Sequence, residues 1–110
     1  MEIRQRTVEG ITIVSITGEI DGSTAPEVQA QVVPLIAADA KIVLDMTDVL
    51  YMSSAGLRML LVVYRRVAGQ GGTVVLTGLS QDLQDTMSLT GFLDFFDHYA
   101  AVDDGVAALR

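Results

Sequence analysis

The chain has 110 residues, half of them apolar, which is enough for one domain over residues 1–110 with a single hydrophobic core. Fourteen acidic residues against seven basic ones give a net charge of −7, which disfavours nucleic-acid binding and fits either an ordinary cytoplasmic domain or one that binds a basic protein. The absence of cysteine excludes disulfides and thiolate metal sites, and no apolar run is long enough for direct membrane insertion or a secretory signal, so we expect a cytoplasmic protein.

The first third of the chain predicts a β-hairpin followed by a helix. Apolar and polar residues alternate over residues 2–8 and 11–17, and the Glu9-Gly10 pair between them is typical of a turn. Residues 18–22 are predicted to form a loop. Thr24 and Glu27 have the spacing of a capping box at the start of a helix over residues 25–38, which Pro34 is expected to kink or shorten.

The rest of the chain alternates strands with helices. A buried strand over residues 42–46 is predicted to run into a short polar turn, and a long apolar helix follows over residues 54–68. Residues 73–77 predict a strand, residues 81–89 a helix, residues 93–99 a short final strand, and residues 102–109 a terminal helix.

This order predicts an α/β fold in which a leading β-hairpin is followed by β-α-β units. The sheet is expected to be mixed, with four to five strands and about four helices. Since the carboxyl ends of parallel strands lie at one edge of a sheet, Asp21, Asp45 and the pair Ser53-Ser54 should gather at that edge.

Ser53 and Ser54 stand where a strand leads into a helix, and two uses of their hydroxyls stay open. Either serine could cap the helix, because a serine oxygen accepts a hydrogen bond from an amide of the first turn. The same amides would favour a phosphate on the hydroxyl. A catalytic nucleophile is not expected, because the one histidine, His98, lies far along the chain and no G-x-S-x-G motif occurs.

The other polar candidates have simpler interpretations. Asp21 precedes Gly22 and is either a turn residue or part of a docking surface beside the serines. Asp45 and Asp48 are expected to fix a loop, since two carboxylates without a phosphate cradle make a weak magnesium site. Metal sites, cofactors and catalytic residues are therefore not expected.

Surface positions on the long helix complete the predicted site. Gly56 has no side chain and would let a partner approach the backbone. Arg58 is expected to stay exposed beside the serines, together with Met59 or Val62, and to contact a partner.

Three motifs resemble those of the STAS domain in its stand-alone form, the anti-sigma factor antagonist. They are Gly18-Glu19-Ile20-Asp21, Val43-Leu44-Asp45-Met46 and Tyr51-Met52-Ser53-Ser54-Ala55-Gly56-Leu57. The resemblance implies that Ser54 is the phosphorylated residue and that Asp21 is the loop aspartate of the family. Ser53 stands where the family often has aspartate, and this makes it a second candidate for phosphorylation.

The resemblance also implies a function. The unphosphorylated protein would bind an anti-sigma factor that is also a serine kinase, and would thereby release a sigma factor. Phosphorylation of Ser54 would block that binding, and a PP2C-type phosphatase would restore it, so the chain would be a substrate and not an enzyme. The alternative is a STAS subunit of a transporter or a stress-signalling complex, without a phospho-switch.

Overall fold

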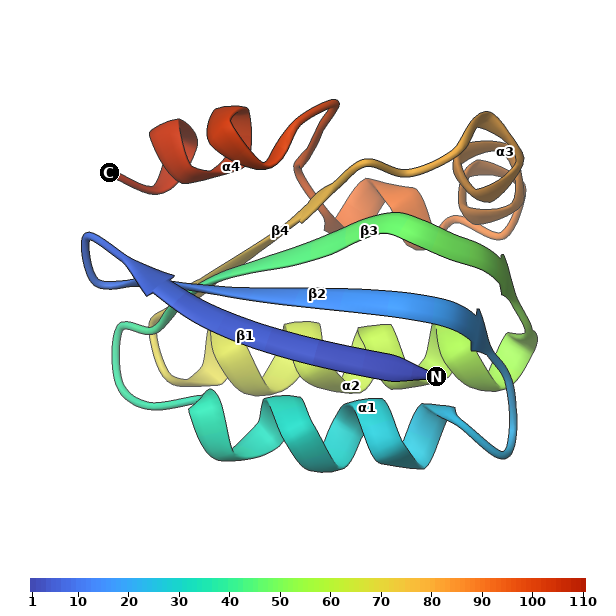
Figure 1. Cartoon of the computed structure of the whole chain (residues 1–110), viewed down its shortest axis with the longest axis horizontal. Coiled ribbons are helices and arrows are strands. Elements are labelled where there is room, and N and C mark those ends of the chain that lie inside the picture. Colours follow the sequence, from blue (N-terminus) through green and yellow to red (C-terminus); the bar gives the residue numbers. More distant parts are fainter.

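The computed structural model describes residues 1–110 and has a five-stranded mixed sheet as its centre (Figure 1). The strands lie in the order β1-β2-β3-β4-β5, where β1 is Glu2–Val8, β2 is Ile11–Ile20, β3 is Lys41–Met52, β4 is Thr73–Thr77 and β5 is His98–Tyr99. β1 pairs with β2 in the antiparallel sense, and all other neighbours are parallel. The predicted α/β class and the leading hairpin are thus confirmed.

Helices cover both faces of this sheet (Figure 1). They are α1 (Ala25–Val32), α2 (Ser54–Gly69), α3 (Gln81–Leu89) and α4 (Val102–Leu109), with short 3-10 helices η1 (Val33–Leu35) and η2 (Phe92–Phe95). α1 and α2 bury the larger apolar cluster against one face, and α4 covers a smaller cluster on the other face. None of the helices is long and apolar enough to cross a membrane.

Two predicted elements are shorter in the structure. The first helix was expected to reach residue 38, but α1 ends at Val32 and continues only as the 3-10 helix η1, which contains Pro34. Proline lacks the amide that would continue the α-helical hydrogen bonds, so the expected shortening is confirmed. The final strand consists of His98 and Tyr99 alone, because residues 92–95 form η2.

β3 is the largest departure from the predicted elements. The polar turn expected after residue 46 is wrong, since the strand continues through it to Met52. Two register shifts against β2, one between Asp45 and Asp48 and one between Val49 and Tyr51, each give β3 one extra residue. Such bulges let a strand carry turn-like residues without ending. The predicted loop at residues 18–22 is likewise partly strand, because β2 extends to Ile20.

Candidate functional site

Polar residues follow the ends of β2 and β3, which are neighbours in the sheet. The last paired residues are Ile20 and Met52, and the Ser53 amide donates a hydrogen bond to the Ile20 carbonyl at 2.9 Å. Asp21 and Ser53 therefore lie side by side where the two strands end. This carboxyl edge is at the right of Figure 1, where α1 and α2 begin.

Asp21 organises the turn between β2 and α1. Its Oδ1 accepts hydrogen bonds from the Ser23 hydroxyl at 2.8 Å, the Ser23 amide at 2.9 Å and the Thr24 amide at 3.1 Å. The predicted capping box is wrong, because the Thr24 hydroxyl donates to the Glu19 carbonyl and makes no capping bond. Asp21, and not Glu27, satisfies amides at this helix start.

The pKa of Asp21 lies below its ordinary value of 3.8. The largest cause is the hydrogen bond from the Ser23 hydroxyl, and the bonds from the Ser23 and Thr24 amides lower it further, because all of them stabilise the carboxylate. A lowered pKa in the folded state adds stability above pH 3.8, and that stability is lost as the pH falls through the folded-state pKa. We therefore expect Asp21→Asn to be less stable than the native chain at neutral pH, in urea unfolding. The difference should shrink progressively below pH 3.8.

The control for this titration is Asp48→Asn, because Asp48 is exposed and its carboxylate accepts no hydrogen bond within the chain. Its unfolding free energy should stay closer to that of the native chain at every pH. A stability difference for Asp21→Asn that persists unchanged in acid would show that the turn depends on the shape of Asp21 and not on its charge.

Ser53 occupies the N-cap position of α2, but its side chain does not cap the helix. Its φ and ψ angles, −80° and 176°, are the extended values usual for an N-cap. The hydroxyl oxygen nevertheless makes no capping bond and is buried without a hydrogen-bond partner. The capping interpretation is therefore wrong for Ser53, and its hydroxyl is buried in the structure.

Because the Ser53 hydroxyl is buried and has no hydrogen bond to lose, we expect Ser53→Ala to leave the free energy of unfolding unchanged or to raise it. The matched control is Ser80→Ala. Ser80 is the N-cap of α3 and its side chain accepts a hydrogen bond from the Leu83 amide at 3.1 Å, so its loss should cost about 1 kcal/mol. Equal losses for the two variants in urea unfolding would contradict the assignment of Ser53.

Ser54 differs from its neighbour in access. It is the first residue of α2 and is exposed, so its hydroxyl is open to solvent at the helix N-terminus. Arg58, one turn further along α2, is also exposed and takes part in neither ion pair of the structure. Met59, by contrast, is buried, so it lies outside the exposed surface that the sequence suggested.

Gly56 is buried and serves packing inside the molecule. A Cβ atom there would come within 2.5 Å of Met52 Cγ and 3.0 Å of the Ile20 carbonyl oxygen. The close approach that only glycine permits is therefore between α2 and the ends of β2 and β3. This packing accounts for the glycine without a partner, and a contact of Gly56 with a partner stays a prediction.

Sequence reasoning missed two apolar residues beside the serines. Leu50 is 80% exposed and Tyr51 is 53% exposed, although both lie in β3. The bulge between Val49 and Tyr51 turns this pair outward while Val49 and Met52 stay in the core. No local signal set this pair apart, because a run of four apolar residues is also usual for a strand that is buried on both faces.

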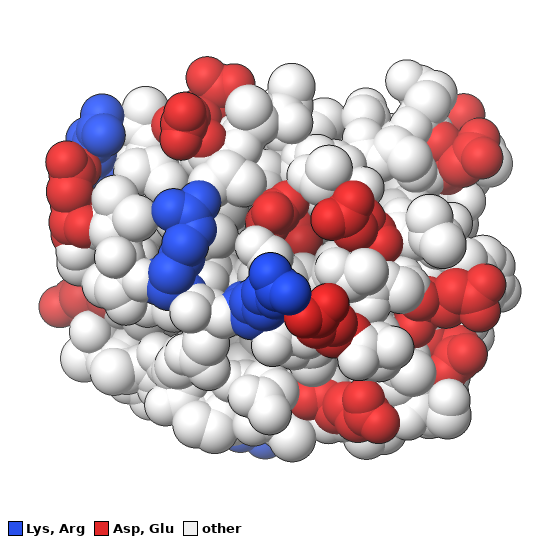
Figure 2. Space-filling model, viewed as in Figure 1, with Lys and Arg blue, Asp and Glu red and all other residues white.

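The charges are unevenly distributed over the surface. On the face shown in Figure 2, acidic side chains dominate the right-hand half, toward the carboxyl edge, and basic ones lie at the centre and left. Exposed acidic residues of β2, β3 and α1 near this edge include Glu19, Asp48 and Glu27. A surface that is acidic and carries exposed apolar side chains is suited to a basic protein partner.

The remaining polar candidates, Asp45 and His98, do not belong to the group of residues at the carboxyl edge. Asp45 accepts hydrogen bonds from the Ser15 hydroxyl at 3.0 Å and from the Thr47 hydroxyl and amide, so it fixes a bulged segment of β3 instead of a loop. The prediction that Asp45 lies at the carboxyl edge is wrong, because β3 continues past it to Met52. His98 is exposed in β5. At the carboxyl edge of β2 and β3 the arrangement thus offers one accessible serine hydroxyl at a helix N-terminus, that of Ser54.

Comparison with known proteins shows the family of this chain. The model of the STAS domain family matches residues 2–105. The chain belongs to the STAS domain family. This STAS domain is 37% identical, over 93 residues, to the anti-sigma-B factor antagonist of Bacillus subtilis (strain 168), covering 84% of the chain and 85% of that protein.

Two further relatives are similar over most of their length. The anti-sigma-B factor antagonist of Listeria monocytogenes serovar 1/2a is 33% identical to this STAS domain over 98 residues, covering 88% of the chain and 85% of that protein. The crystal structure of an anti-sigma factor antagonist from Mycobacterium paratuberculosis superposes with a TM-score of 0.88 at 26% identity, covering 99% of this chain and 93% of that one.

Proposed function

We propose that this STAS domain is an anti-sigma factor antagonist that changes partners when Ser54 is phosphorylated. The observation that carries the proposal is the exposed Ser54 hydroxyl at the start of α2, on the edge it shares with Asp21. The similarity to two anti-sigma-B factor antagonists supports the class of partner. Such a protein would act in the cytoplasm, where sigma factors bind RNA polymerase.

The position of Ser54 is suited to carrying a phosphate. α2 has 16 residues, so its N-terminus offers unpaired amides and the positive end of a long helix dipole. A phosphate on Ser54 would bring a charge near −2 and three acceptor oxygens to these amides. The helix start can therefore hold the modified side chain in the folded protein.

The surroundings of Ser54 are suited to a protein partner. Leu50 and Tyr51 supply exposed apolar area, and the nearby acidic side chains favour a basic surface opposite them. Arg58 is an exposed cation on α2, one turn after Ser54. We propose that Asp21, Ser54 and Arg58 contact the anti-sigma factor, with Gly56 and Ser53 supporting them from inside.

In this role the chain is a substrate. The anti-sigma factor, a serine kinase, would transfer the γ-phosphoryl group of ATP to Ser54 Oγ, with magnesium that the kinase itself binds. The phosphorylated form would then release the kinase. A PP2C-type phosphatase would hydrolyse the phosphate ester and return the protein to its binding state.

Phosphorylation by the serine-kinase anti-sigma factors of the source organism tests the proposal. We expect incubation with such a kinase and ATP to add one phosphate to the native chain, located on Ser54 by mass spectrometry. Ser54→Ala should accept none, while the control Ser53→Ala should still accept one, because the Ser53 hydroxyl is buried. Phosphate on Ser53, or none with any such kinase, would contradict the proposal and favour a STAS subunit without a phospho-switch.

A further inference from the structure

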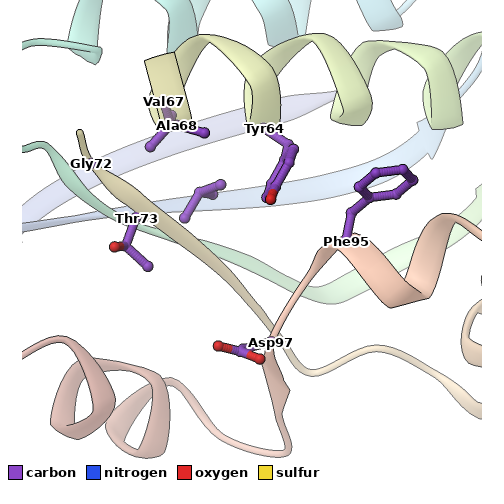
Figure 3. A pocket seen from close by; sticks show the side chains of 8 residues that line it. Tyr64, Val67, Ala68, Gly72, Thr73, Phe95 and Asp97 are labelled. Atoms are coloured by element: carbon purple, nitrogen blue, oxygen red, sulfur yellow. The ribbon is translucent and has the colours of Figure 1, made fainter. Parts of the chain in front are cut away.

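A hollow of about 240 Å³ lies at the opposite end of α2 from Ser54 (Figure 3). One wall is the last part of α2, with Tyr64, Val67 and Ala68. The first residues of β4 border it on a second side, and the segment from Phe95 to Asp97 closes the third. It is therefore a recess of mixed polarity, with apolar side chains on the α2 side and one carboxylate at its rim.

The recess lies against an unpaired part of the sheet edge. β5 pairs only with Leu76 and Thr77, so the first half of β4 has no neighbour on its outer side. The chain leaves the ladder there because η2 turns toward α2, where the rings of Phe95 and Phe96 lie 5.6 Å and 5.4 Å from the ring of Tyr64.

Hydrogen-bond alternation shows which backbone groups are open. The Thr73 amide donates inward to Ala40, beside β3, whereas the Leu76 amide donates outward to Asp97. Successive residues of a strand direct their amide and carbonyl groups to opposite sides. The N–H and C=O of Val74 therefore point outward, toward the stretch where β5 is missing.

We propose that an extended segment of a partner protein adds to β4 at Val74 as a short extra strand. Its backbone would pair with the N–H and C=O of Val74, which is how peptides bind open sheet edges. An apolar side chain of the segment would enter the recess beside Tyr64 and Ala68. A Lys or Arg one or two residues away would face Asp97, which is exposed and forms no ion pair in the structure.

This surface is separate from the one proposed for the anti-sigma factor. Ser54 and Ala68 are fourteen residues apart on one helix, which corresponds to about 21 Å at roughly 1.5 Å per residue. A second protein could therefore dock on β4 while the carboxyl edge is occupied. A partner segment is expected to bind β4 whether or not Ser54 carries a phosphate.

The test selects random dodecapeptides from a phage display library on the full chain, with subtraction on Ala68→Trp. Ala68 is exposed at the recess, and an indole there would fill it. Selected peptides are expected to alternate β-branched or aromatic residues with polar ones and to contain Lys or Arg. When they are titrated into the labelled protein, the Val74 amide should shift in NMR spectra and exchange its hydrogen more slowly.

Binding constants of matched variants complete the test. Ala68→Trp should weaken binding at least tenfold, while Ala107→Trp, an exposed alanine of α4, and Ser54→Asp should leave it unchanged. Asp97→Asn should weaken it about threefold to fivefold, as for an exposed ion pair. Failure to select any peptide that distinguishes the native chain from Ala68→Trp would overturn the proposal. So would selected peptides that leave the Val74 amide unmoved, an observation that needs no variant to fold.

Discussion

Phosphorylation of Ser54 is expected to weaken binding to the anti-sigma factor by about 10²–10⁴-fold, which corresponds to roughly 3–5 kcal/mol. The physical reason is that a bulky dianion would replace a neutral hydroxyl at a contact fitted to the unmodified serine. Taking the strongly hydrated phosphate out of water in that contact adds a desolvation cost. Binding is to be measured by titration calorimetry with fully phosphorylated and unphosphorylated protein.

Single-charge variants separate the effect of position from that of net charge. Ser54→Asp places one negative charge at the helix start and should weaken binding less than the phosphate does, by about 10–100-fold. Ser88→Asp adds the same charge at an exposed position of α3 and should have little effect. If Ser54→Asp binds as tightly as the native chain and phosphorylation also has no effect, the proposed switch is wrong.

The arrangement of the site followed from a general property of parallel sheets. Because β2 and β3 are parallel neighbours, the residues after their ends had to meet, and Asp21 and Ser53 do so. The sequence did not distinguish the accessibility of the two serines. That difference depends on how the start of α2 packs, which leaves the Ser53 oxygen buried and Ser54 exposed.

Most strand and helix positions were also predictable, and the exceptions share a cause. β4, α3 and α4 have the predicted bounds, because their apolar patterns end at glycine, serine or polar residues. In β3 the Asp45 carboxylate binds the Thr47 amide and hydroxyl, which is chemistry usual in turns. In this chain the same local bonds occur within a bulged strand, because pairing with β2 keeps this segment in the sheet. Long-range pairing of this kind leaves no local pattern.

Replacing Gly56 with alanine is expected to lower the free energy of unfolding by about 1–2 kcal/mol. The new methyl would lie 3.0 Å from both the carbonyl oxygen and the Cγ2 atom of Ile20, and 2.5 Å from Met52 Cγ. The Met52 side chain can move, but the Ile20 backbone is held in the β2–β3 ladder. Overpacking of about 1–3 kcal/mol should therefore exceed the gain of up to about 1 kcal/mol in helix propensity.

Gly69→Ala is the matched control, because it replaces glycine with alanine in the same helix, at a position where the new methyl contacts neither Ile20 nor Met52. A Cβ at Gly69, the last residue of α2, would have no atom within 4 Å, and its φ angle is not in the left-handed region. This variant should gain up to about 1 kcal/mol, so the two alanines are predicted to shift the midpoint of thermal unfolding in opposite directions. A gain in both would mean that α2 can move away from the ends of β2 and β3. In that case Gly56 would not fix the position of Ser54 against Asp21, and the packing argument for the site would fail.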